Sequence, residues 1–333
     1  MKKLLMLFAV ALVLLAAIAW TGWQRYQDFL ATPLNIPADG QVFELEVGAT
    51  GSAIVQQLAA MGLARPGWEW RVLMRLEPHV YRAGEYLLEP GSGPQAVLHK
   101  LSSADVIQYR LTVVEGWTFS QLLDALATNE TLRHELETDP VDAGWRTTLG
   151  LEWDHPEGWF LPETYQFSRG DSDRDILLRA HQAMQRALAE AWEARDTGLP
   201  LESPYEMLIL ASIIEKETSI DHERSQVAGV FIRRLQKGMR LQTDPTVIYG
   251  LGDTFDGDIR RRDLKADTPY NTYTRHGLPP TPIALPGKAS LLAAGQPDAG
   301  NALYFVADGK GGHTFSATLE EHQAAVNKLI GRN

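Results

Sequence analysis

The chain has 333 residues with 42 acidic and 31 basic side chains, which gives a formal net charge of −11. Nucleic-acid binding needs a basic stripe or patch, and the sequence has none, so a nucleic-acid partner is not expected. The sequence also has no cysteine. This excludes disulfides, thiolate metal sites and cysteine nucleophiles. The length leaves room for two domains.

The N-terminal segment MKKLLMLFAVALVLLAAIAWTGWQRY has two lysines and then an apolar run from Leu4 to Trp20. About 20 apolar residues span a bilayer, so residues 1–25 are predicted to be a transmembrane anchor. The alternative is a cleaved signal peptide with Ala17-Ile18-Ala19 at its cleavage site, although the apolar run exceeds the roughly 7 to 15 residues of a signal core. In both cases the lysines favour a cytoplasmic N-terminus. The predicted location is the inner (cytoplasmic) membrane, with the rest of the chain extracytoplasmic or periplasmic.

The next segments predict a short tether and a small module. Residues 26–40 are polar and contain prolines, as is typical of a tether. Residues 41–105 twice combine a strand-like stretch, a turn with glycine and an amphipathic helix. Residues 106–333 then form a larger domain that begins with an alternating strand over 106–114. Hairpins and segregated helices in one chain predict the α+β class.

Three helices are predicted in the middle of the larger domain, over 172–195, from Ser203 onwards, and over 222–237. The second has Ser203 as N-cap, proline in its first turn and Glu206 as the acidic member of a capping box. Residues 241–287 are rich in turn formers, aromatics and amides, which predicts an ordered functional loop region. A hairpin with a glycine-rich turn and a helix opened by a Thr318 capping box complete the chain.

The stretch MLILASIIEKETSI ends a strongly apolar helix with two glutamates. On a helical wheel Glu217 falls between Leu210 and Ile213, whereas Glu215 falls beside smaller side chains. Desolvation among aliphatic groups raises the pKa of a carboxyl group, which suits a general acid near neutral pH. Glu217 is therefore a candidate acid. The alternative is that both glutamates belong to an exposed helix end with weak ion pairs.

Other chemistries have less support. Histidines with the spacing of a metal site are absent, so no metal is expected, and His222, Glu223 and His322 are predicted to lie on the surface. A nucleophile elbow and glycine-rich phosphate loops are also absent, so no cofactor is expected.

Seven motifs in order resemble the endolytic murein transglycosylases, a YceG-like family. They are VVEGWTFSQLLDAL, EGWFLPETYQF, LASIIEKET, VAGVFIRRL, GMRLQTDPTVIYG, TPYNTYTRHGLPPTPI and YFVADGKGGHTFSATLEEHQAAV. The resemblance covers nearly the whole chain. It implies a single N-terminal anchor at residues 1–25, a LysM-like module at 41–105 and a mixed α+β catalytic domain at 106–333. Glu163 and Thr268 stand where Asp and Ser are more usual in the family.

The resemblance implies that Glu217 is the acid and base of non-hydrolytic cleavage at the β-1,4 bond between N-acetylmuramic acid and N-acetylglucosamine. The C6 hydroxyl of the muramic residue would attack C1 and leave a 1,6-anhydro end. Peptidoglycan strands are thus the expected substrate, and cell-wall synthases are candidate partners. Five residues with side chains suited to sugars are candidates for substrate binding: Tyr165, Gln242, Asp244, Asn271 and Tyr273.

Three alternatives remain open at this stage. The first is a muramidase that hydrolyses the same bond with Glu217 and a second carboxylate such as Asp244 or Glu163. The second is a non-catalytic scaffold that binds the cell wall through the LysM-like module. The third is a cytosolic cofactor-dependent lyase, which an exported chain does not favour.

Overall fold

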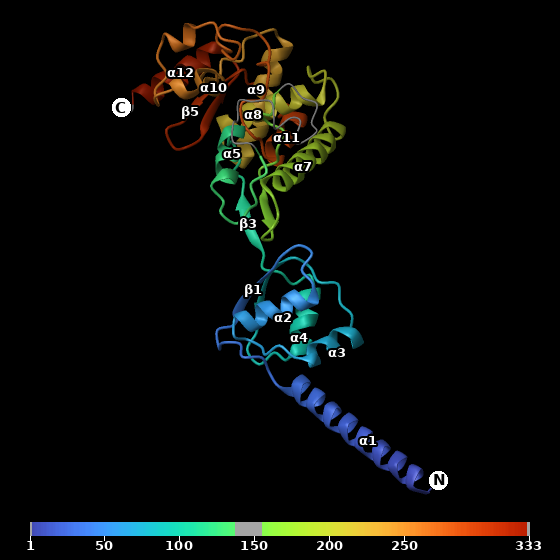
Figure 1. Ribbon diagram of the computed structural model, residues 1–333. Helices are drawn as coiled ribbons and strands as arrows, with labels where there is room; N and C mark the ends of the chain where they lie inside the picture. The colour runs from blue at the N-terminus through green and yellow to red at the C-terminus, as the bar shows by residue number, and fades with distance from the viewer. Residues whose placement is uncertain (1, 137–154, 332–333) are drawn as a thin grey trace. The chain divides into compact units, whose positions relative to one another are not determined.

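The computed structural model describes residues 2–136 and 155–331 (Figure 1). Within these residues, the structure contains helices and three two-stranded sheets, β1-β2, β3-β4 and β5-β6. The predicted α+β class is therefore confirmed. The chain divides into two units, the first comprising Met1–Tyr109 with Phe167–Gly170 and the second Arg110–Gln166 with Asp171–Asn333. Each is described by itself.

The first unit has one small sheet covered by short helices. Its elements are α1 (Lys2–Ala31), β1 (Gln41–Leu45), α2 (Gly51–Ala60), α3 (Trp68–Leu76), β2 (Gly84–Leu88) and α4 (Pro94–Ser102). The strands β1 and β2 are antiparallel, with Phe43 opposite Tyr86. Both of these side chains are fully buried. The resulting core confirms the predicted strand–helix pattern, while its LysM-like character stays a prediction.

The helix α1 is longer than the predicted anchor. It continues to Ala31, and Tyr26 near its end is buried in the core of the first unit. Leu34 and Ile36 belong to the same core. Residues 26–40 thus contribute apolar side chains to this core, and their role as a tether stays a prediction. The earlier part of α1 is long and apolar enough to cross a membrane.

The second unit is built around the apolar helix α8 (Pro204–Glu217), which packs against four other helices. These are α7 (Asp173–Glu193), α9 (Asp221–Gln236), α10 (Asp244–Leu251) and α11 (Lys288–Gly295). The remaining elements are β3 (Tyr109–Thr112), α5 (Phe119–Ala127), β4 (Thr164–Phe167), η1 (Gly252–Thr254), η2 (Asp263–Lys265), β5 (Tyr304–Ala307), β6 (His313–Ser316) and α12 (Leu319–Ile330). Every residue of α8 from Met207 to Ile214 is buried. A helix that is apolar on all sides requires this surrounding layer.

The beginning of α8 is specified mainly as predicted. The Ser203 hydroxyl accepts a hydrogen bond from Glu206 N at 3.3 Å, and a proline occupies the first turn. The predicted capping box is wrong in one contact: the Glu206 carboxylate accepts from Glu202 N at 2.6 Å. The acidic side chain thus reaches one residue further back than a capping box requires. The helix ends at Glu217 because Thr218 adopts an extended backbone.

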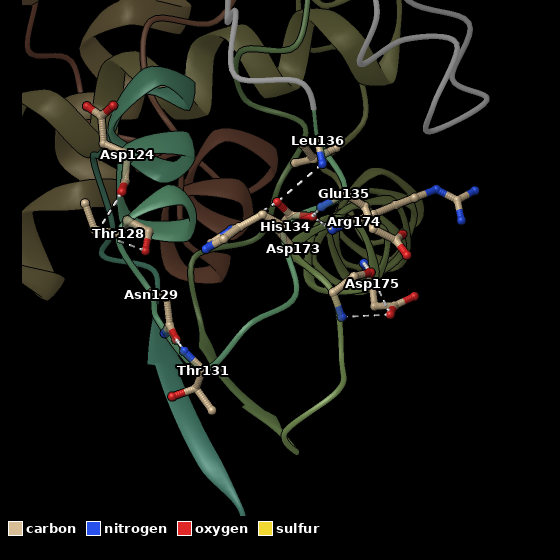
Figure 2. A network of polar contacts seen from close by, with 12 residues as sticks. Asp124, Thr128, Asn129, Thr131, His134, Glu135, Leu136, Asp173, Arg174 and Asp175 are labelled. Atoms are coloured by element: carbon tan, nitrogen blue, oxygen red, sulfur yellow. Dashed lines mark hydrogen bonds and ion pairs between the residues drawn. The ribbon is translucent and has the colours of Figure 1, made fainter. Parts of the chain in front are cut away.

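The start of α7 is held by two aspartates (Figure 2). Asp175 completes a capping box with Ser172, and Asp173 accepts hydrogen bonds from Glu135 N at 2.9 Å and Leu136 N at 3.4 Å. Carboxylates at a helix N-terminus also interact favourably with the helix dipole. The predicted helix over 172–195 is confirmed.

The strands β5 and β6 form the predicted hairpin, with Ala307 opposite His313. Asp308 closes the turn by accepting from Lys310 N at 2.6 Å and Gly312 N at 3.1 Å. Gly309 and Gly311 take positive φ angles of 73° and 99°, which explains the glycine-rich sequence. The Thr318 capping box that opens α12 is confirmed.

Candidate active site

A cavity of about 480 Å³ lies at the end of α8 in the second unit. Its floor contains Glu217, and its walls come from α9, the start of α10, the hairpin and α12. The lining residues are Glu217, Arg234, Gln242, Asp244, Tyr273, Tyr304, Phe305, Val306, Ala307, His313, Leu319 and His322. A cavity of this size with aromatic walls and several polar groups suits a small part of a polar ligand.

The two glutamates at the end of α8 have different surroundings. Glu215 accepts hydrogen bonds from Gly287 N at 2.9 Å and Ser290 Oγ at 2.8 Å, and Arg224 Nη2 lies 3.6 Å from its other oxygen. Its side chain is 5% exposed. Glu215 therefore joins α8, α9 and α11, and it does not line the cavity. The alternative of an exposed helix end is wrong for both carboxylates.

In the described part of the chain, the Glu217 side chain has one hydrogen-bond partner, and it lines the cavity. The Thr243 hydroxyl donates a hydrogen bond to its Oε1. Burial and the nearby Asp244 carboxylate raise the pKa of Glu217, whereas the Thr243 hydrogen bond, His313 and Arg234 act in the opposite direction. Burial is the largest effect, so the net pKa is raised. A carboxyl group with a raised pKa can carry a proton closer to neutral pH, as a general acid must.

A strained turn presents Thr243 to Glu217. Among the described residues, Gln242 is the non-glycine residue with a positive φ, at 50°. Gln242 N donates to Thr272 O at 3.2 Å, and Thr243 N donates to Thr272 Oγ1 at 3.1 Å. These bonds fix the turn in the left-handed conformation despite its cost. Such strain is often found at functional sites.

Asp244 and Tyr273 form a polar pair on the wall of the cavity. The Tyr273 hydroxyl donates to Asp244 Oδ1 at 2.6 Å. Burial and this carboxylate both raise the pKa of the Tyr273 phenol, which therefore stays protonated. Gln242, Asp244 and Tyr273 are thus three predicted binding residues that the structure brings to the cavity beside Glu217.

The structure does not bring the other two predicted binding residues there. Asn271 is 1% exposed, and its side-chain nitrogen donates to three backbone carbonyls, of Asp263, Leu264 and Ala266. It is a structural turn residue. Tyr165 is 8% exposed and donates to Leu161 O at 2.5 Å, so its aromatic ring fills the core.

Glu163, the other carboxylate suggested for a hydrolytic mechanism, is exposed and pairs with Lys288 at 3.2 Å. It does not line the cavity. Asp244 is therefore the suggested second carboxylate that the structure places near Glu217.

Two basic side chains of the cavity were not predicted from the sequence. Arg234 is buried in α9 and lines the cavity. His313 enters from β6, and its Nδ1 lies 2.8 Å from Glu223 Oε2. Glu223 is 5% exposed and also accepts from His313 N and from the Thr218 hydroxyl. The predicted surface position of Glu223 is wrong, because this carboxylate holds both the hairpin and the residue after Glu217.

His322 also lies in the cavity and stacks on Tyr304, with ring centroids 5.3 Å apart. His322 is partly exposed where it lines the cavity, and His222 is exposed as expected. The histidines at 313 and 322 lie far along the chain from Glu217, so no local spacing predicted that they share its cavity. Within residues 2–136 and 155–331, no group of three or more His, Asp or Glu side chains is arranged to hold a metal ion.

Comparison with known proteins places this cavity in a family context. The model of the YceG-like family matches residues 43–328, which include every residue that lines the cavity. The chain belongs to the YceG-like family. A crystal structure of a yceG-like protein from Listeria monocytogenes has 29% sequence identity and a TM-score of 0.55, and the match covers 86% of this chain and 99% of that one.

Two relatives of this YceG-like chain are named endolytic murein transglycosylase. The protein of Bacillus subtilis (strain 168) is 34% identical over 266 residues, which cover 75% of this chain and 73% of the relative. That of Streptococcus pneumoniae serotype 2 is 26% identical, over 96% of this chain and 64% of the relative. The family resemblance predicted from the seven motifs is confirmed.

Proposed function

We propose that this YceG-like chain is a lytic transglycosylase that cleaves the β-1,4 bond between N-acetylmuramic acid and N-acetylglucosamine in peptidoglycan strands. The observation that carries the proposal is the placement of Glu217, a carboxyl group with a raised pKa, in a cavity with Asp244 and Tyr273. The names of the two relatives support the substrate and the reaction class.

In the first step, protonated Glu217 donates its proton to the glycosidic oxygen while the bond from that oxygen to C1 breaks. The carboxylate that remains accepts the hydrogen bond of Thr243 and lies in the positive field of Arg234. Both interactions favour the charged form. Glu217 is therefore held in surroundings that can support each of its protonation states.

In the second step, the C6 hydroxyl of the muramic residue attacks C1, and its proton passes to the Glu217 carboxylate. The product is a 1,6-anhydro end, and the acid is restored without consuming water. An inverting hydrolase needs a second carboxylate to activate water. Here the nucleophile comes from the substrate, so the reaction does not need that carboxylate. One acid/base residue is sufficient.

Mass spectrometry of digested glycan strands tests the reaction. Anhydro ends, lighter than reducing ends by one water, support the transglycosylase. Reducing muramic ends would instead indicate a muramidase with Asp244 as the second carboxylate. Binding of strands without any cleavage would support the scaffold.

The proposal extends to the location of the enzyme. Residues 1–25 would anchor the chain in the cytoplasmic membrane, with the catalytic unit outside the cytoplasm. The apolar part of α1 supports this, because it is long enough to span a bilayer and is not buried in the protein. Recovery of the full chain in the membrane fraction after a high-salt wash is expected. A soluble, shortened product would indicate a cleaved signal sequence.

A further inference from the structure

Arg234 is a buried cation with no carboxylate oxygen within 4 Å among the described residues. The residue is 7% exposed, yet none of the ion pairs among the described residues involves it. A buried charge is normally paired, because removing it from water is costly. The neighbouring buried arginine on α9, Arg224, follows this rule and lies within 4 Å of three carboxylates, at Glu115, Asp221 and Glu215. Arg234 therefore needs another explanation.

Part of the guanidinium group has a structural role. Arg234 Nε donates to Leu303 O at 2.7 Å, and Nη1 donates to Leu241 O at 2.5 Å. The guanidinium carbon also lies 5.3 Å from the centre of the Tyr304 ring. Within the described part of the chain, no hydrogen bond uses Nη2. The side chain is thus fixed at two points and keeps donors available beside the cavity that it lines.

The acidic groups of the cavity act on Arg234 only at longer range, as the Glu217 carboxylate does. Glu217 accepts from Thr243, and Asp244 accepts from Tyr273. Neither carboxylate forms an ion pair with Arg234 within 4 Å. Of the other two basic side chains that line the cavity, His313 is held by Glu223, and burial lowers the pKa of the His322 imidazole, which disfavours its charged form. The available cationic group of the cavity is therefore Arg234.

We propose that Arg234 forms a subsite for a carboxylate of the glycan substrate, in the same cavity as Glu217. This inference rests on the proposed function, because muramic residues carry such a group: either the free carboxylate of the lactyl ether or a carboxylate of the attached peptide. A guanidinium group with its Nη2 donors available and its position already fixed binds a carboxylate with little further loss of side-chain entropy. The subsite would select muramic residues and place them at Glu217.

Direct binding to the full-length Glu217→Gln protein tests this subsite without turnover. One pair of probes is a peptide-free glycan oligomer with free lactyl carboxylates and its methyl ester. A second pair is the peptide-bearing oligomer with free or amidated peptide carboxylates. Binding of the charged member at least about tenfold tighter is expected in one pair, and that pair identifies the source of the carboxylate. Equal affinity within both pairs, or no binding to any probe, overturns the inference.

Two further variants in the Glu217→Gln background assign the effect to Arg234. Arg234→Gln should remove the preference for the charged probe, and Arg234→Lys should keep part of it. Arg233→Gln is the matched control, because Arg233 donates to Ala302 O and Asp298 O in the same segment but lines a different cavity. It should keep the full preference. A preference that survives Arg234→Gln contradicts the assignment.

The probes also separate this inference from the proposed function. If the wild-type protein forms anhydro ends but the Glu217→Gln protein does not distinguish the probes, the subsite is wrong and the reaction stands. If the probes are distinguished but no strand is cleaved, the subsite stands and the reaction is wrong. The comparison of probes needs no change at Arg234, so a folding defect in that variant cannot obscure the result.

Discussion

The hydroxyl of Thr243 donates a hydrogen bond to Oε1 of Glu217, the last residue of α8. A hydrogen bond to the charged form lowers the pKa of a carboxyl group. Thr243→Val should therefore raise the pKa of Glu217 further and move the alkaline limb of the pH–rate profile of glycan cleavage to higher pH. Thr243→Ser keeps the hydroxyl and should leave this limb in place. A limb that moves to lower pH, or that moves equally in both variants, contradicts this role of Thr243.

The contact between Glu223 and His313 predicts an effect on stability in acid. Burial opposes ionisation, but the hydrogen bonds from His313 and Thr218 outweigh it and lower the pKa of Glu223. A lowered pKa in the folded state gives stability above the pKa of the unfolded state, and this stability is lost as the pH falls through the folded pKa. Glu223→Gln should therefore reduce the free energy of unfolding at neutral pH and flatten its decrease in acid. Urea unfolding at several pH values measures both effects.

Glu320→Gln is the control for that series, because Glu320 lies exposed in α12. It should follow the wild-type pH dependence. If Glu223→Gln also follows it, the buried contact contributes no pH-dependent stability.

The surroundings of Glu157 predict the opposite pH dependence of the free energy of unfolding. It is 3% exposed, accepts from Phe119 N at 2.9 Å and from the Tyr249 hydroxyl at 3.1 Å, and burial raises its pKa from 4.5 to about 7. Between these values the folded state holds more protons than the unfolded state, so stability falls as the pH rises. Glu157→Gln should remove this loss, which amounts to roughly 3 kcal/mol. A wild-type protein that loses no more stability than the variant between about pH 5 and pH 8 contradicts this interpretation.

Because Gln242 has a positive φ, substitutions at this position can distinguish the role of its backbone from that of its side chain. Glycine adopts this conformation at no steric cost, which offsets its larger entropy in the unfolded chain. Gln242→Gly should therefore change the free energy of unfolding by less than about 1 kcal/mol, while removing a side chain from the cavity should weaken glycan binding. Gln242→Ala keeps the strain and should bind equally weakly. Unchanged binding in both variants would exclude a contact between Gln242 and the glycan.

Local sequence patterns predicted the elements that depend on local interactions. The capping residues of α8 and α12 and the glycine-rich turn of the hairpin lie within a few positions of the structure that they specify. The wheel of α8 also separated Glu217 from Glu215. It did not predict that Glu215 is buried, because the partners of Glu215 come from α9 and α11.

The predicted site was incomplete for the same reason. Arg234 reaches the cavity from α9, whereas His313 and His322 reach it from β6 and α12, far from α9 along the sequence. Asn271 and Tyr165 carried residue types that suit sugars, yet their polar atoms are occupied by backbone carbonyls. Residue type suggested these contacts, but only tertiary packing determines which polar groups remain available.

The most direct test of the account compares Glu217→Gln with Glu215→Gln by the rate at which anhydro ends form on purified glycan strands. Removal of the general acid in Glu217→Gln should lower this rate by about 10² to 10⁴-fold. The unfolding temperature of this variant should equal that of the wild-type protein. Glu215→Gln should lower the unfolding temperature, because Arg224 loses a buried partner, and still form anhydro ends. Formation of anhydro ends at the wild-type rate by folded Glu217→Gln would contradict the role of Glu217 as the general acid.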